Sequence, residues 1–203
     1  MGPEPESLWT IVLIKGFDQA KTRLSAVLDR SARQELARAN ARRSLIAAAG
    51  SGCVLAVVSD HDAAALAREH GVEVLLETQS RGQNTAAASG IAHAVGKGAN
   101  EVLLLSSDLP LITNIEVRRM VEAGRALASP AVLAAAAIGR GGTNALYLRP
   151  PLAVDLQFGP DSLPKFQAAA QAAGAYFAIF RSDGLALDLD EPSDLELLAR
   201  AQA

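Results

Sequence analysis

The sequence lacks, or has few of, several features that would indicate a function directly. Only one of its 203 residues is a cysteine, Cys53, which excludes an intramolecular disulfide and a cysteine-based zinc site. Aromatic residues make up 4% of the chain, and no apolar run reaches the roughly 18 residues of a membrane-spanning helix. The first residues, Met-Gly-Pro-Glu-Pro-Glu, lack the basic start and apolar stretch of a signal peptide. We therefore expect a cytoplasmic protein that binds no membrane.

The charge and the loop motifs exclude further classes. The formal net charge of −3 provides no basic field, so nucleic acid is not an expected partner. Neither a P-loop nor a Gly-x-Gly-x-x-Gly fingerprint follows the first apolar run, which counts against P-loop enzymes and dinucleotide dehydrogenases. The chain is 50% apolar, which is typical of a globular protein. We expect a single domain over residues 8–203, a disordered tail over residues 1–7, and Cys53 in the core.

Short apolar runs alternate with helical patterns, which predicts an α/β fold with a mainly parallel sheet flanked by helices. After Pro130 the pattern changes, and two apolar runs joined by Gly139-Arg-Gly-Gly142 predict a β-hairpin insertion. This hairpin is also a candidate surface for a homodimer. The expected strands are 8–14, 53–59, 72–76, 101–106, 131–138, 144–148 and 176–180, and the expected helices are 31–49 (with Ser31 as N-cap), 60–69, 83–95, 113–127, 161–173 and 192–201.

Carboxylates follow apolar runs in two places. Asp108 and a proline end the run that begins at Glu101, and Asp188 and Asp190 alternate with leucines before a helix start. In open α/β sheets the carboxyl ends of strands are where ligands bind. If both segments converge, their carboxylates could hold a Mg²⁺ ion that also takes substrate phosphates. This arrangement points to an enzyme that acts on a nucleoside triphosphate.

Three cations follow the first strand within nine residues: Lys15, Lys21 and Arg23. Lysine supplies a compact charge and arginine a planar fork that matches phosphate oxygens, so this loop could hold a triphosphate. A solvated basic loop without a ligand is the alternative. Two glycine-containing turns, Gly141–Asn144 and Phe158–Ser162, offer backbone N–H groups and hydroxyls to an anion. As isolated turns they would equally serve as ordinary helix caps.

Together, these motifs resemble a known family. Lys-x-Phe-x-x-Ala-Lys-Thr-Arg-Leu, Ser-Asp-Leu-Pro, Gly-Thr-Asn-Ala-Leu, Phe-Gly-x-x-Ser and Leu-Asp-x-Asp-x-Pro-x-Asp-Leu occur in this order from about Leu8 to Leu198. The chain thereby resembles the 2-phospho-L-lactate or phosphoenolpyruvate guanylyltransferases of coenzyme F-420 biosynthesis. The resemblance implies a Rossmann-like nucleotidyltransferase domain of glycosyltransferase-A type, and a transfer of GMP from GTP to a small phosphorylated carboxylic acid with release of pyrophosphate.

The same resemblance implies roles for individual residues. Asp108, Asp188 and Asp190 would hold the Mg²⁺ ion. Thr143, Gly159 and Ser162 would receive the phosphate and carboxylate of the acid, and Lys15, Lys21 and Arg23 would contact the GTP phosphates.

Two segments depart from the family pattern, and other functions stay open. Leu13-Ile14 stands where a proline is common, and the start at Gln83-Asn84-Thr85-Ala86 is more polar than usual, so no guanine-reading residue can be named. The acceptor could instead be 3-phospho-D-glycerate. The chain could also be a molybdopterin or sugar-phosphate nucleotidyltransferase, or a non-catalytic nucleotide-binding subunit on the same fold.

Overall fold

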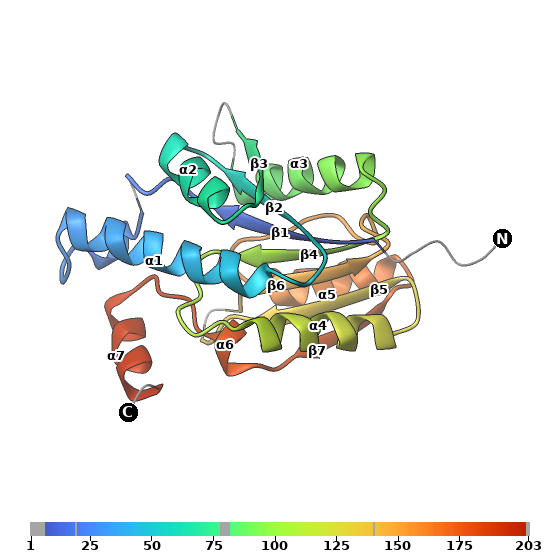
Figure 1. The fold of residues 1–203 in the computed structure, drawn as a ribbon. Coiled ribbons are helices and arrows are strands. Elements are labelled where there is room, and N and C mark those ends of the chain that lie inside the picture. Colours follow the sequence, from blue (N-terminus) through green and yellow to red (C-terminus); the bar gives the residue numbers. More distant parts are fainter. Residues whose placement is uncertain (1–6, 19, 78–81, 140, 202–203) are drawn as a thin grey trace.

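The computed structural model describes residues 7–18, 20–77, 82–139 and 141–201. Seven strands form one sheet with the order β3-β2-β1-β4-β6-β5-β7, and helices cover it (Figure 1). The strands are β1 (Leu8–Ile14), β2 (Cys53–Val58), β3 (Glu73–Leu76), β4 (Glu101–Ser106), β5 (Ala131–Ala136), β6 (Thr143–Arg149) and β7 (Tyr176–Phe180). The helices are η1 (Thr22–Leu24, a 3-10 turn), α1 (Arg30–Ala48), α2 (His61–Glu69), α3 (Gln83–Gly96), α4 (Asn114–Ala126), α5 (Ser162–Ala172), α6 (Asp183–Ala186) and α7 (Pro192–Ala201).

The direction of β6 decides which residues meet at the edge of the sheet. β1 pairs in parallel with β2 and β4, β2 with β3, and β5 with β7, whereas β6 is antiparallel to both β4 and β5. The beginning of β6 therefore lies at the edge where the parallel strands end. Its first residue, Thr143, pairs with Ala136 at the end of β5.

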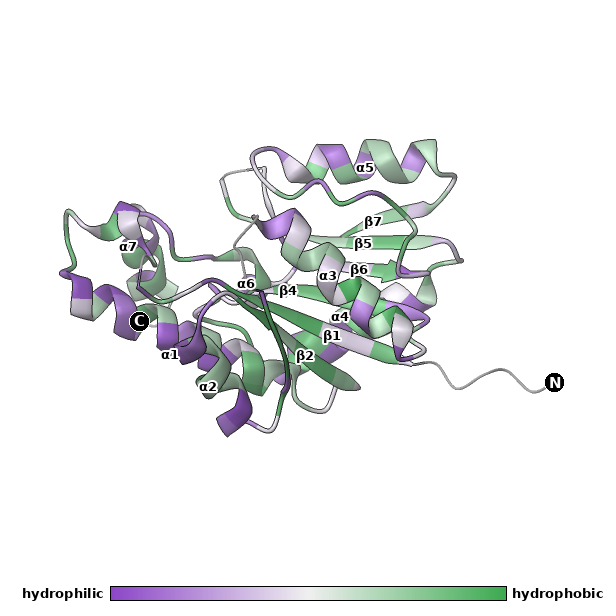
Figure 2. Ribbon diagram, turned by 90° about the horizontal axis from the view of Figure 1, so that it is seen from above, coloured by the Kyte–Doolittle hydropathy of each residue, from purple (hydrophilic) through white to green (hydrophobic). Residues whose placement is uncertain are grey.

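Alternation of side chains along the strands divides the core into two layers. One layer packs beneath α1, α2, α4 and α6 and contains Val12 of β1 and Leu105 of β4. The other packs beneath α3 and α5 and contains Ile11 of β1 and Leu104 of β4. The two sets of helices lie on opposite faces of the sheet (Figures 1 and 2). Burial on both faces explains why the strands are continuous apolar runs.

The expected α/β fold and the β5–β6 hairpin are confirmed, and two expected details are wrong. The hairpin lies inside the sheet with the apolar residues of its strands mostly buried, while Ile138 beside its turn is exposed, and its use as a homodimer surface stays a prediction. Helix α1 is capped by Asp29, whose carboxylate accepts from the Ala32 N–H at 2.8 Å, and not by Ser31. Cys53 is exposed because β2 enters the core only two residues later.

The expectation of a disordered tail falls almost entirely on residues 1–6, which lie outside the described residues. Within the ranges that the structure describes, the helices are too short or too polar to cross a membrane.

A buried ion pair supports the sheet at the edge opposite to the strand ends discussed above. Glu101, the first residue of β4, is fully buried and accepts hydrogen bonds from Arg125 Nε at 2.9 and 3.1 Å and from the Tyr147 hydroxyl. Burial and the neighbouring Glu101 carboxylate raise the pKa of Tyr147, which keeps its phenol a neutral donor. Gly124 lies against the Tyr147 ring, where a β-carbon would come within 2.4 Å of a ring atom.

We predict that Arg125→Ala lowers the free energy of unfolding by about 3 kcal/mol, because it leaves the Glu101 carboxylate buried without its ion-pair partner. Urea denaturation followed by circular dichroism measures this change. Arg119→Ala removes an exposed arginine from the same helix and serves as the control. Equal losses in the two variants would contradict the importance of the buried pair.

Candidate functional site

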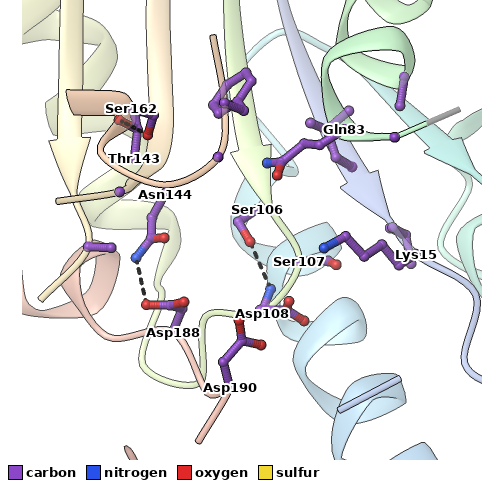
Figure 3. A pocket seen from close by; sticks show the side chains of 18 of the residues that line it. Lys15, Gln83, Ser106, Ser107, Asp108, Thr143, Asn144, Ser162, Asp188 and Asp190 are labelled. Carbon is purple, nitrogen blue, oxygen red and sulfur yellow. Dashed lines mark hydrogen bonds between the residues drawn. The ribbon is translucent and has the colours of Figure 1, made fainter. Parts of the chain in front are cut away.

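A cavity of about 440 Å³ lies along the edge where the parallel strands end. The ends of β1, β2 and β4, the beginning of β6 and the beginning of α3 all contribute to its lining. Figure 3 shows Lys15 and Gln83 pointing into it from one side, and Thr143, Asn144 and Ser162 lying across from them. Convergence of strand ends, as anticipated from the sequence, therefore produces a concave site.

The two acidic segments meet at the middle of this cavity. The Leu189 N–H donates to the Asp108 carbonyl oxygen at 3.1 Å, so the main chains are joined directly. Asp108, Asp188 and Asp190 all line the cavity, as Figure 3 shows. Nothing in the local sequence of either segment indicates this pairing, because 80 residues separate them.

A lysine lies between two of these carboxylates. Lys21 Nζ is 2.7 Å from Asp108 Oδ1 and 3.3 Å from Asp190 Oδ1, and its side chain is only 2% exposed. Lys21 has φ of 55°, a left-handed conformation that few residues other than glycine adopt. The two ion pairs hold the residue in this conformation and offset the repulsion between the carboxylates.

The three cations predicted to contact phosphates thus have different surroundings. Lys15 is exposed and lines the cavity. Arg23 also lines it, with Nη1 3.5 Å from Glu191 Oε1 and 66% of its side chain exposed. Lys21 is buried against Asp108 and does not line this cavity, but it lines an adjoining cavity of about 630 Å³ together with Lys15 and Arg23. Lys15 and Arg23 therefore line both cavities, and Lys21 lines the second.

Polar side chains from α2 and α7 hold the loops that carry these groups. Asp60 caps α2 through the Ala63 N–H at 2.7 Å, and its second oxygen accepts from the Phe17 N–H at 2.8 Å. A β-carbon on Gly16 would come within 2.7 Å of Asp60, so the loop requires glycine there. The buried Asp194 accepts from the N–H groups of Asp190 and Glu191 at 2.8 and 2.7 Å.

The two glycine-containing turns also come together, at the other end of the cavity. Ser162 Oγ donates to Thr143 Oγ1 at 3.0 Å, and the Leu163 N–H donates to the Gly141 carbonyl oxygen at 3.0 Å. Gly159 lines the same end and has φ of 130°, which favours glycine. The residues of each turn predict an anion-receiving turn, and the structure makes the two turns neighbours.

Asn144 connects this end to the acidic segment. Its Nδ2 donates to the carbonyl oxygens of Leu185 and Ala186 at 3.0 and 3.2 Å, and lies 3.5 Å from Asp188 Oδ1 (Figure 3). In the sequence Asn144 is only one residue of a turn, and no signal there indicates its contact with Asp188.

The opposite end of the cavity is lined by the ends of β1 to β3 and by the start of α3. Leu13, Val57 and Ala86 give it an apolar wall, and Gln83 and Glu77 give it polar groups. Burial raises the pKa of Glu77, since its carboxylate is partly removed from water. A desolvated carboxylate in a cleft is a frequent mark of a binding site.

Comparison with known proteins identifies the family. A family model described as "Guanylyl transferase CofC like" matches residues 8–200. The chain belongs to this family. The resemblance inferred from the motifs is thereby confirmed, and with it a nucleotidyltransferase fold and an enzyme of this class.

Curated relatives carry two different acceptor names. A phosphoenolpyruvate guanylyltransferase of Rubrobacter xylanophilus is 36% identical over 195 residues, which cover 95% of this chain and 93% of that protein. A 3-phospho-D-glycerate guanylyltransferase of Phenylobacterium zucineum is 32% identical over 196 residues, which cover 94% of this chain and 88% of that protein.

Solved structures show the same fold at low sequence identity. A protein of Desulfovibrio desulfuricans G20, described as a nucleotide-diphospho-sugar transferase, has a TM-score of 0.77 at 16% identity, covering 96% of this chain and 87% of that one. A Mycobacterium tuberculosis H37Rv protein solved in complex with manganese has a TM-score of 0.56 at 16% identity, covering 96% of this chain and 99% of that one.

Proposed function

We propose that this enzyme transfers GMP from GTP to phosphoenolpyruvate or 2-phospho-L-lactate, with release of pyrophosphate, as a cytoplasmic step of coenzyme F-420 biosynthesis. The observation that carries the proposal is a single cavity with an apolar end at α3, a hydroxyl-lined end at Thr143 and Ser162, and carboxylates between them. The family and the names of the curated relatives support guanylyl transfer.

The apolar end suits the guanosine of GTP. Leu13, Val57 and Ala86 would contact the faces of the base and ribose. Guanine presents two neighbouring N–H donors, and an ionised carboxylate accepts two such bonds at once. Among the described residues that line this end, Glu77 has that chemistry. The triphosphate would then extend toward Lys15 and Arg23.

The hydroxyl-lined end suits the phosphorylated acid. Thr143 and Ser162 offer hydroxyls that are already hydrogen-bonded to each other, and so are held in place before an anion arrives. The N–H group of Gly159 would add a donor, and the dipole of α5 favours an anion at this end of the helix. These are the roles expected of Thr143, Gly159 and Ser162 from the family resemblance.

The carboxylates between the two ends of the cavity provide some, but not all, of the ligands of a divalent metal ion. Within the described residues, no three histidine, cysteine, aspartate or glutamate side chains lie close enough together to hold a metal ion by themselves. Mg²⁺, however, is usually bound by one or two carboxylates together with water and substrate phosphates. The Asp108 and Asp190 side chains are 26% and 39% exposed, so both remain accessible beside Lys21.

We therefore assign Asp108 and Asp190, with Asp188 beside Asn144, as the residues that would hold Mg²⁺. The manganese in the complex from Mycobacterium tuberculosis supports a divalent cation on this fold. When bound, the ion would neutralise charge on the α-phosphate during transfer.

The proposed reaction is an in-line displacement. A phosphate oxygen of the acid attacks the α-phosphorus of GTP, the bond from that phosphorus to the bridging oxygen breaks, and pyrophosphate leaves with the electron pair. An ionised phosphate needs no general base, so the side chains must align two anions and offset their repulsion. Lys15 and Arg23 would neutralise the departing pyrophosphate, while Lys21 fixes Asp108 and Asp190.

The first test is pyrophosphate release from GTP and Mg²⁺ with phosphoenolpyruvate, 2-phospho-L-lactate and 3-phospho-D-glycerate supplied separately. We expect release with phosphoenolpyruvate or phospholactate. Release with 3-phospho-D-glycerate alone would select the second acceptor, which the Phenylobacterium relative makes a specific alternative. If none of the three acids gives pyrophosphate release while GTP still binds, the proposal is rejected in favour of another acceptor or a non-catalytic role.

We predict that Asp108→Asn and Asp190→Asn each reduce kcat at least ~10²-fold, because each removes a carboxylate from the reacting centre. Both variants should also need more Mg²⁺ for half-maximal rate. The exposed Asp155→Asn serves as the control. Unchanged rates and unchanged Mg²⁺ dependence in both variants would remove the metal assignment.

We predict that Glu77→Gln reduces the preference for GTP over ITP by about tenfold, because ITP lacks the 2-amino group that a carboxylate would bind together with the ring N–H. The ratio of kcat/KM for the two nucleotides measures this preference. Glu69→Gln, an exposed substitution at the end of α2, provides the matched control. A wild-type ratio in Glu77→Gln would exclude Glu77 as a reader of guanine.

A further inference from the structure

The side chain of Asn84 connects the two ends of the cavity by hydrogen bonds. Asn84 Nδ2 donates to the Phe158 carbonyl oxygen at 3.1 Å, and the Phe158 N–H donates to Asn84 Oδ1 at 2.8 Å. The carboxamide therefore pairs with both backbone groups of one residue, 74 positions further along the chain. A reciprocal pair of this kind fixes orientation as well as distance, which a single hydrogen bond does not.

The two partners belong to different halves of the site. Asn84 is the second residue of α3 and follows Gln83, which lines the end assigned to guanosine. Phe158 immediately precedes Gly159 and lies four residues before Ser162, at the end assigned to the acid. The pair thus bridges the nucleotide half and the acceptor half at the surface of the protein.

The segment that Asn84 holds has little regular structure of its own. Residues 150–161, between β6 and α5, form no helix and no strand. The Phe158 ring packs edge-on against Phe166 of α5, with 5.1 Å between ring centroids. The ring contact attaches the segment to α5, in the acceptor half of the site. The Asn84 carboxamide attaches the backbone of Phe158 to α3, in the nucleotide half.

We infer that Asn84 is a positioning residue that sets the conformation of the Phe158–Gly159 segment and thereby the affinity for the acceptor acid. Asn84 is not among the residues that line the cavity, so it acts through the backbone that it binds. The inference rests on the proposed function, because it assigns the acceptor to the end containing Gly159 and Ser162. Its consequence falls on the acceptor more than on GTP, because α3 keeps its own backbone hydrogen bonds when the side chain is removed.

Steady-state kinetics with Asn84→Ala test the inference. The loss of two hydrogen bonds of ordinary strength corresponds to a rise of about tenfold in KM for the acceptor acid, with KM for GTP within about twofold of the wild type. The control is Asn100→Ala, which removes a comparable exposed bond, from the Ser7 N–H to Asn100 Oδ1 at 3.0 Å, near the beginning of β4. Thermal unfolding of both variants checks that they are folded.

The outcomes separate the inference from the function on which it rests. A selective rise in acceptor KM in Asn84→Ala, not seen in Asn100→Ala, supports the positioning role. An active wild type whose acceptor KM is unchanged in Asn84→Ala overturns it and leaves the guanylyltransferase function intact. Equal rises in both KM values indicate a general structural role and also overturn it. If the wild type releases no pyrophosphate with any of the three acids, the proposed function and this inference are both rejected.

Discussion

The ammonium of Lys21 is the point on which the arrangement of the site depends. It draws together Asp108, which follows β4, and Asp190, which precedes α7, while the loop that carries Lys21 follows β1. Without a cation at this position the two carboxylates would repel each other in a region where water screens them only in part. The direct hydrogen bond from Leu189 to Asp108 then adds a main-chain connection between the same segments.

The fold could be predicted largely from the sequence because burial on both sheet faces leaves a clear signal. The strands Leu8–Ile14, Glu101–Ser106 and Tyr176–Phe180 have the expected bounds. The 3-10 turn Thr22–Leu24 and the short helix Asp183–Ala186 were not anticipated, since three or four residues are too few to show a helical period. Cys53 was misplaced because an apolar run does not reveal where along it the core begins.

Individual residues of the site could be predicted from the sequence, but the hydrogen bonds that join distant segments could not. Asp108 and Asp190 each follow an apolar run in the sequence, although only Asp108 follows a strand, and the structure brings both within reach of one lysine. The long-range ties made by Asp60, Asn84 and Asp194 could not be anticipated. A single polar residue has no periodicity, and each looks like an ordinary helix cap or surface residue until its distant partner is known.

The reversed strand β6 has an evolutionary consequence. The parts that would bind GTP come from the first half of the chain, whereas Thr143 and Ser162 come from a hairpin and a helix start added after it. Substitutions around the hairpin turn can therefore alter one substrate while the other keeps its surroundings. Such separate change of the acceptor site would produce relatives that use different acceptors. Two relatives that are each about one-third identical to this chain are indeed named for phosphoenolpyruvate and for 3-phospho-D-glycerate.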